Sequence, residues 1–136
     1  MAFSDPAKGR DILDSGRGTQ PQKVTLGEAC VAGDVLGYSS GWKRALATTG
    51  SVIQGRVIAL KGGASGADVP VSANPVVGGY SGATPGGYVY VDEGTNYGQI
   101  TQTAPSTSGD ANTIIGIALS ATEVMFFLNS RVDSTA

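Results

Sequence analysis

Short apolar runs separated by turn-forming residues dominate the second half of the chain. Between residues 86 and 129, the runs Tyr88–Val91, Gln99–Thr103, Thr113–Leu119 and Val124–Leu128 are divided by clusters of Gly, Asn, Ser, Thr and Pro. Runs of this length between such clusters are typical of antiparallel strands. No window has the three- and four-residue apolar spacing of an amphipathic helix. The pattern predicts an all-β protein.

An earlier segment repeats this order of elements. Residues 33–74 also pass from a short strand through a turn to a strand ending in Thr, and the segments Gly55–Leu60 and Ile115–Leu119 share the motif Ile-Ala-Leu. A Gly- and Val-rich β-protein could show some of these similarities through composition alone. The repetition favours two similar units of about 42 residues, 33–74 and 86–129. Each is too small to bury enough apolar surface alone, so both are expected in one small antiparallel β-sandwich or barrel-like domain over 23–129.

Alternation along two strands of the second unit assigns their faces. Ile115, Ile117 and Leu119 lie on one face of their strand, and only small residues lie on the other. The strand Val124–Leu128 is apolar on both faces, which is typical of a central strand buried on both sides.

The corresponding strand of the first unit contains Pro70, which predicts an edge position because proline has no N–H to donate to a ladder. The predicted core consists of Val35, Leu36, Val52, Ile53, Val57, Ile58, Leu60, Val89, Val91, Ile100, Ile114, Ile115, Ile117, Leu119, Val124, Phe126 and Leu128.

Residues 1–22 differ from the rest of the chain because they are polar, with balanced charges and several Gly and Pro residues. A free tail is one interpretation, and one helical turn over Asp11–Asp14 is another local possibility. Apolar anchors, together with arginines that can pair with carboxylates on a partner, favour an extended arm that lies across a neighbouring protein and orders on binding. The candidate contact residues of this arm are Phe3, Arg10, Ile12, Leu13 and Arg17. Residues 130–136 are expected to form a short C-terminal tail.

Three large side chains are candidates for self-association. Trp42, the single tryptophan, is expected half-buried at the rim of the sheet, with an indole N–H that needs a partner. Met125 and Phe127 occupy the second apolar face of their strand, which is expected to meet either the other unit or another subunit.

Composition and charge narrow the class of protein. The 136 residues fit one domain, 15% of them are charged, and the net charge is −2. The basic residues do not cluster, which argues against a nucleic-acid partner. No apolar run approaches the length of a membrane span and no signal peptide is evident, so synthesis and retention in a reducing cytoplasm are expected.

The sequence contains no set of residues that predicts catalysis, a metal or a cofactor. It has no histidine, and Cys30 is the single cysteine, so a thiolate zinc site is excluded and Cys30 is expected to pack as a small hydrophobe. Asp92 and Glu93 are adjacent and are expected to be solvated, while Asp110 is the only acidic residue in its loop. Neither arrangement has the alternate spacing of a calcium loop. The sequence therefore gives no positive case for an enzyme.

The C-terminal half carries a family pattern. It consists of Gly98–Ser106, with the sequence GQITQTAPS, and the segment Ile115–Val124 with the apolar strand after it. Together with residues 32–60, this pattern resembles the head decoration (capsid cement) proteins of tailed bacteriophages over about residues 24–129. The N-terminal arm lies outside the resemblance.

The resemblance implies a virion structural protein on the outer surface of an icosahedral head. Such a protein binds the major capsid protein after expansion, often as a trimer or dimer, and holds neighbouring subunits together against internal pressure. A homo-oligomer is therefore expected, with a trimer favoured and a dimer possible.

The alternative is a β-module of a phage tail or fibre that binds a host glycan or another tail protein, because similar strands occur in those proteins. Exposed aromatic residues would serve a glycan site, and the candidates are Tyr80, Tyr88, Tyr90 and Tyr97.

Overall fold

The computed structural model describes residues 2–7, 9–14 and 22–136. The described part contains eleven strands and no helix, as the sequence pattern predicts. The strands are β1 (Asp11–Asp14), β2 (Gln22–Thr25), β3 (Val35–Tyr38), β4 (Trp42–Arg44), β5 (Val57–Ala59), β6 (Asp68–Ser72), β7 (Val76–Gly78), β8 (Tyr88–Val91), β9 (Ile100–Thr101), β10 (Gly116–Ala118) and β11 (Val124–Phe126).

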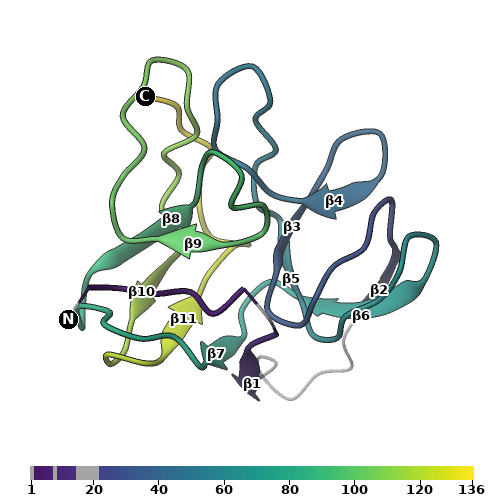
Figure 1. The fold of residues 1–136 in the computed structure, drawn as a ribbon, viewed down its shortest axis with the longest axis horizontal. Coiled ribbons are helices and arrows are strands. Elements are labelled where there is room, and N and C mark those ends of the chain that lie inside the picture. The colour runs from purple at the N-terminus through teal and green to yellow at the C-terminus, as the bar shows by residue number, and fades with distance from the viewer. Residues whose placement is uncertain (1, 8, 15–21) are drawn as a thin grey trace.

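The strands form two sheets that lie on opposite sides of the molecule (Figure 1). The six-stranded sheet has the order β1-β7-β11-β10-β8-β9, and the five-stranded sheet has the order β2-β6-β5-β3-β4. Every ladder between these strands is antiparallel. The outer strands of the five-stranded sheet approach each other at one isolated bridge, between Leu26 and Trp42, and form no continuous ladder there. The architecture is a small β-sandwich, and neither sheet is a closed barrel.

The strand orders confirm the predicted internal duplication. Adding five to each number in the order β2-β6-β5-β3-β4 gives β7-β11-β10-β8-β9, which is the six-stranded sheet without β1. The strands before the two units, β2 and β7, therefore occupy equivalent positions beside β6 and β11. Composition alone would not produce the same topology twice, so the repetition is structural.

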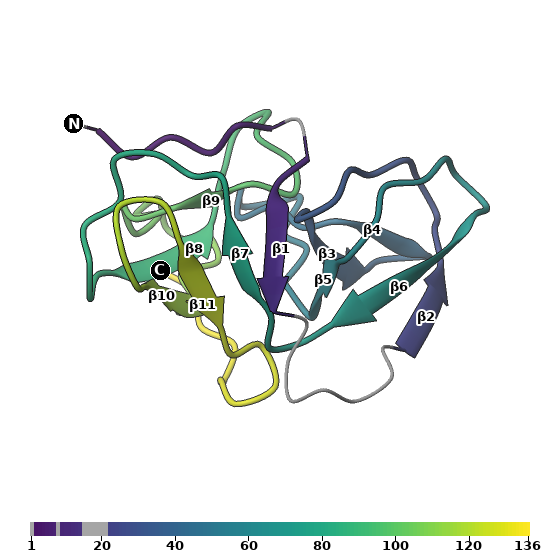
Figure 2. The ribbon, with the colours of Figure 1, turned by 90° about the horizontal axis from the view of Figure 1, so that it is seen from below.

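The five-stranded sheet contributes to two separate cores. Val35 and Ile58 contribute to the main core with the interior of the second unit, while Leu36 and Ala59, on the opposite face of the same strands, belong to a smaller core. The smaller core also contains Leu26 and is confined to the first unit and the strand before it. The five-stranded sheet therefore buries apolar side chains on both faces, and Figure 2 shows β1 at the junction between the two halves.

The predicted buried face of the strand at 115–119 is wrong in part. Gly116 and Ala118 of β10 are buried, whereas Ile117 is half-buried and Leu119 is exposed, although Ile115 is buried. A Cβ atom at Gly116 would lie 2.5 Å from the carbonyl oxygen of Met125, so this face has room only for small residues. Large side chains from the flanking strands β8 and β11 fill the interior instead.

Most of the other predicted core residues are buried. Five of them, Val52, Ile53, Val57, Leu60 and Ile114, are only half-buried. Core residues that the pattern did not single out include Leu26, Ala45, Leu46, Ala47, Val69, Val71, Val77 and Tyr80.

The edge position predicted from Pro70 is also wrong, because β6 lies between β2 and β5. The N–H of Leu60 donates to the carbonyl oxygen of Pro70 at 2.9 Å. The nitrogen and carbonyl of one residue in an antiparallel strand point to the same neighbouring strand, so the nitrogen of Pro70, which carries no hydrogen, also faces Leu60. Pro70 therefore costs the ladder one bond, and that bond would have reached Leu60, just past the end of β5.

The central position predicted for Val124–Leu128 is confirmed, since β11 pairs with both β7 and β10. Burial on both faces is not observed. Val124, Phe126 and Leu128 are in the main core, whereas Met125 is 36% exposed and Phe127 is half-buried. One face of this strand is therefore left partly uncovered.

We expect Gly116→Ala to destabilise the protein by about 1–3 kcal/mol, because the added methyl group meets the backbone of β11. Ile117→Val in the same strand faces outward and is the matched control, with an expected loss below about 1 kcal/mol. Urea unfolding of both variants measures the difference. Equal stability of the two variants would contradict the close approach of β10 to β11.

Candidate functional site

The N-terminal strap, which we define as residues 2–7 and 9–14, lies on the protein's own body. Ser4 forms a bridge with Ser81, and β1 pairs with β7 through Asp11↔Gly78 and Ile12↔Val77. The sequence predicted an arm that reaches a neighbouring protein, with a helical turn at Asp11–Asp14 as one local possibility. In the structure those four residues form a strand at the edge of the chain's own sheet, so the helical turn is wrong.

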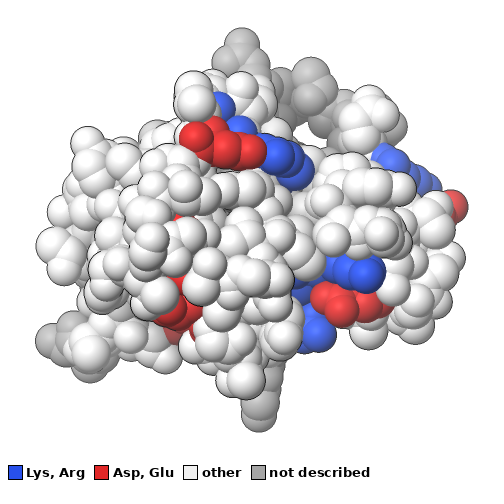
Figure 3. Space-filling view, turned by 90° about the horizontal axis from the view of Figure 1, so that it is seen from above, with Lys and Arg blue, Asp and Glu red and all other residues white. Residues whose placement is uncertain are grey.

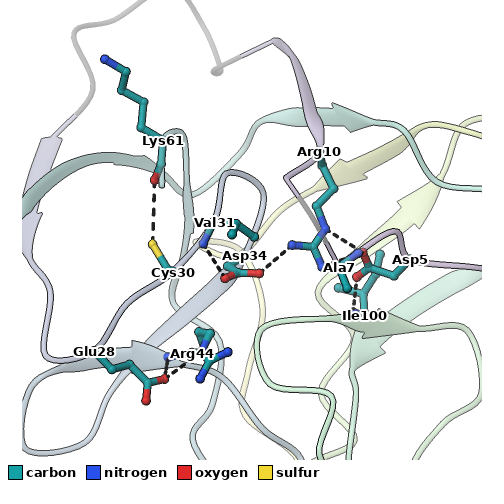
Figure 4. Close-up of polar contacts among 10 residues, drawn as sticks. All are labelled: Asp5, Ala7, Arg10, Glu28, Cys30, Val31, Asp34, Arg44, Lys61 and Ile100. Carbon is teal, nitrogen blue, oxygen red and sulfur yellow. Dashed lines mark hydrogen bonds and ion pairs between the residues drawn. The ribbon is translucent and has the colours of Figure 1, made fainter. Parts of the chain in front are cut away.

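The strap is held by the buried guanidinium group of Arg10 (Figure 4). Its Nη1 donates to Oδ1 of Asp34 at 2.6 Å, and its Nε and Nη2 both lie 2.6 Å from Oδ1 of Asp5. The Arg10 side chain is 0% exposed, and the two carboxylates are nearly as deeply buried.

The remaining oxygens of both carboxylates are also satisfied. Oδ2 of Asp34 accepts from the backbone N–H of Val31 at 2.9 Å, and Oδ2 of Asp5 accepts from the backbone N–H of Ile100 at 3.0 Å. The backbone N–H of Arg10 donates to the carbonyl of Ala32 at 2.9 Å. The network therefore connects the strap to the first unit through Asp34 and to the second unit through Ile100.

Local backbone geometry lets the strap approach this closely. Gly33 has a φ of +88°, and a Cβ atom there would lie 2.6 Å from the Cβ and Cδ of Arg10. Only glycine fits both the left-handed backbone and the narrow space.

Burial and neighbouring charges shift the pKa values of Arg10 and Asp34 in opposite directions. Burial lowers the pKa of Arg10, but Asp5 and Asp34 outweigh this effect, so its pKa is raised above the ordinary value. Burial raises the pKa of Asp34, although the Val31 N–H and the Arg10 guanidinium partly oppose that shift. Arginine side chains stay protonated in folded proteins, so the buried unit is a cation between two carboxyl groups.

The structure places the predicted contact residues of the arm in different environments. Phe3 stacks on Tyr80 with ring centroids 5.7 Å apart, and Ile12 packs against the main core. Arg10, predicted to pair with a partner's carboxylates, pairs inside its own chain. Leu13 is 51% exposed, and Arg17 lies outside the described residues.

A cavity of about 210 Å³ lies beside the network. Its lining includes Ala7, Cys30, Asp34, Arg44, Tyr97 and Gln99. Arg44 pairs with Glu28 at 3.1 Å and lies over the Tyr97 ring, with its Cζ 5.3 Å from the centroid. Both oxygens of Asp34, the carboxylate that borders this cavity, accept a hydrogen bond from the chain itself.

Cys30 behaves as the small buried hydrophobe that the sequence predicts. It belongs to the smaller core, and its Sγ donates weakly to the carbonyl of Lys61 at 3.8 Å. Burial raises the pKa of its thiol to about 11.

A row of apolar side chains crosses the outward face of the six-stranded sheet. Tyr88 of β8 pairs with Ile117 of β10, Ile117 pairs with Met125 of β11, and Met125 pairs with Val76 of β7. These four residues form the apolar row. Tyr88 is 55% exposed and Met125 36%, while Ile117 and Val76 are half-buried.

A shallow groove extends the apolar row at one end. Its lining includes Tyr88, Ile114, Phe127 and Val132. Two of the three predicted self-association residues, Met125 and Phe127, therefore belong to one surface.

The third predicted self-association residue, Trp42, lies on the other sheet. It is half-buried against the smaller core, as predicted, and its ring meets the ring of Tyr38 edge-to-face at 5.6 Å. The apolar row is hard to find in the sequence because its four members are separated along the chain and only strand register brings them together.

Charged side chains are sparse on the face shown in Figure 3, where acidic and basic groups lie next to each other and form no continuous basic field. The described residues contain no helix that could cross a membrane. They also contain no group of three or more His, Cys, Asp or Glu side chains arranged to hold a metal ion.

Comparison of the chain with family models, with curated proteins and with solved structures found no match.

We expect Arg10→Met to destabilise the protein by about 3–5 kcal/mol, because it leaves two buried carboxylates without their cation. Arg56→Met removes a largely exposed pair with Asp133 and is the matched control, with an expected loss of about 0.2–1 kcal/mol. Arg10→Lys keeps the charge without the planar fork and should fall between them. Urea unfolding gives all three values, and a loss below about 1 kcal/mol in Arg10→Met would contradict the role of the network.

We expect the Cys30 thiol to react with a disulfide reagent at pH 8 about 100-fold more slowly in the folded protein than in urea. The raised pKa reduces the thiolate fraction by about that factor, and burial slows the reaction further. Absorbance of the released thiol measures both rates. Similar rates in the two states would show that Cys30 is accessible.

Proposed function

We propose that this chain is a structural protein of a tailed-phage virion, which binds the outer surface of the expanded head and holds neighbouring major capsid subunits together. The apolar row is the observation that carries this proposal. Its side chains form a continuous band across four strands in a chain whose charged residues total 15%. Contiguous exposed apolar surface of this kind marks binding sites on proteins. The resemblance of residues 24–129 to decoration proteins supports the identity of the partner.

The apolar row replaces the N-terminal arm as the proposed contact with the head. Arg10 and Phe3 have partners in their own chain, and Ile12 packs on the core. The strap then acts before binding, because it joins the two units into one rigid body that can bridge two points on a lattice. Rigidity matters because a flexible bridge would bind the compact and expanded lattices with similar free energy.

Stabilisation of the head follows from differential binding. A protein that contacts two capsid subunits at the spacing of the expanded lattice binds only that state and shifts the equilibrium towards it. Each half-exposed apolar side chain of the row contributes about 1 kcal/mol when it becomes fully buried. Many copies on one head multiply this small gain.

The positions of the tyrosines give little support to the alternative function, glycan binding by a tail module. Tyr80 is buried beneath Phe3, and Tyr90 is half-buried within β8. Tyr88 belongs to the apolar row, and Tyr97 lies against Arg44. The four rings do not form one exposed aromatic platform.

Co-sedimentation with compact and expanded heads of the parent phage tests the proposal. We expect saturable binding to expanded heads alone, and at least about a 10-fold loss of affinity in Met125→Glu, because binding would bury the new charge. Tyr38→Glu is the matched control, since Tyr38 is an exposed aromatic residue on the other sheet. Tyr88→Ser provides a second, uncharged change in the row.

Light scattering and thermal unfolding report the oligomeric state and the folding of the same variants. Wild-type affinity in Met125→Glu and Tyr88→Ser would overturn the assignment of the row to the head. If Met125→Glu instead converts an oligomer into monomers, the row is the contact between copies expected from the sequence, and its assignment to the head is also overturned. Equal binding to both kinds of head would contradict recognition of lattice spacing.

A further inference from the structure

One buried carboxylate of the second unit has an oxygen without a partner. Asp110 is 1% exposed, and its Oδ1 accepts a hydrogen bond from the backbone N–H of Thr49 at 2.7 Å. Its Oδ2 is buried and has no hydrogen-bond donor among the described residues. A buried carboxylate oxygen normally has a donor or a cation as partner, because taking the charge out of water is costly.

A second carboxyl group, that of Glu93, lies on a neighbouring loop. The backbone N–H of Gly94 donates to the Thr48 hydroxyl at 2.8 Å and that of Thr49 donates to Asp110 at 2.7 Å, so residues 48–49 bring the loop of Glu93 and the loop of Asp110 together. Asp110 raises the pKa of Glu93, as a neighbouring carboxyl group does. Neither of them belongs to an ion pair among the described residues. Two adjacent carboxylates with no basic side chain need either a shared proton or a cation between them.

The surrounding loops offer further oxygen atoms. The Thr48 hydroxyl accepts from the backbone N–H of Gly94, which places it next to Glu93. The Thr49 hydroxyl lies against Gly109, next to Asp110. Both carboxylate oxygens of Asp92 are already occupied, by the backbone N–H of Glu93 and by the Asn96 side chain.

We propose that Asp110 and Glu93 bind a divalent cation, and that the cation is calcium. Calcium accepts six to eight oxygen ligands in irregular geometry, so two carboxylates, threonine hydroxyls and water can complete its shell. Magnesium demands a near-octahedral arrangement, which three separate loops are less suited to provide. The bound ion would connect the first unit, through residues 48–49, to two loops of the second unit.

Calcium titration of the full chain tests this site. After removal of metals with a chelator, we expect about 10 mM calcium chloride at pH 7 to raise Tm by roughly 4–10 °C, with a Kd between about 10⁻⁴ and 10⁻³ M by calorimetry. The affinity should fall as the pH is lowered. Protons compete with the ion for the carboxylate oxygens as the pH falls.

Three variants test whether these two carboxyl groups bind the ion. Glu93→Gln changes an exposed side chain and should abolish the calcium response without preventing folding, and Asp110→Asn should do the same. Glu123→Gln removes a carboxylate elsewhere on the chain and is the matched control, with a wild-type response expected. Sodium chloride at equal ionic strength should leave Tm nearly unchanged.

Several outcomes would overturn the proposal. One is a wild-type protein whose Tm does not respond to calcium at that concentration, and another is a Glu93→Gln variant that responds like the wild type. A rise in Tm at pH 7 in Glu93→Gln, combined with no calcium response in the wild type, would show that the two carboxylates repel each other with no ion between them. The proposed site is independent of head binding, so neither result depends on the other.

Discussion

The buried guanidinium of Arg10 has two carboxylates as partners, and the position of the N-terminal strap depends on this arrangement. Asp5 and Asp34 direct all four of their oxygens to Arg10 or to backbone N–H groups, so each charge faces an opposite charge. Nη2 of Arg10 makes an ion pair with Asp5 but no hydrogen bond. A buried network of this kind contributes to stability only when its charges are paired, because each unpaired charge would cost several kcal/mol. The contacts of the network therefore form together with the strap in one position, in which β1 lies against β7.

The duplicated fold shows how similar sequences acquire different roles. The two units share one strand order, yet Ile58 is in the main core while Ile117, from the same Ile-Ala-Leu motif, faces outward in the apolar row. The five-stranded sheet is covered on both faces by its two cores, and the six-stranded sheet has only one core. The second unit is therefore left with an outward apolar face, and that difference makes it the proposed binding unit.

Two sets of buried carboxylates lie between the units and differ in their partners. At the strap, a cation from the chain satisfies two buried carboxylates. At Asp110, a buried carboxylate has one backbone donor, and its neighbour is a second carboxyl group. The same physical requirement, a partner for each buried charge, is met by Arg10 at the strap and leads to the proposed calcium ion at Asp110.

The sequence by itself determined the all-β class, the two units and most of the main core, because period-two alternation and turn residues are local signals. The tertiary structure decided the face of β10, the internal position of Pro70 and the course of the strap. These features depend on which strand lies alongside another and on how closely backbones approach, and a single sequence does not encode them locally. Arg10, Asp34 and Ile100 illustrate the reason: their contacts join residues far apart in the chain, so only the folded protein brings them together.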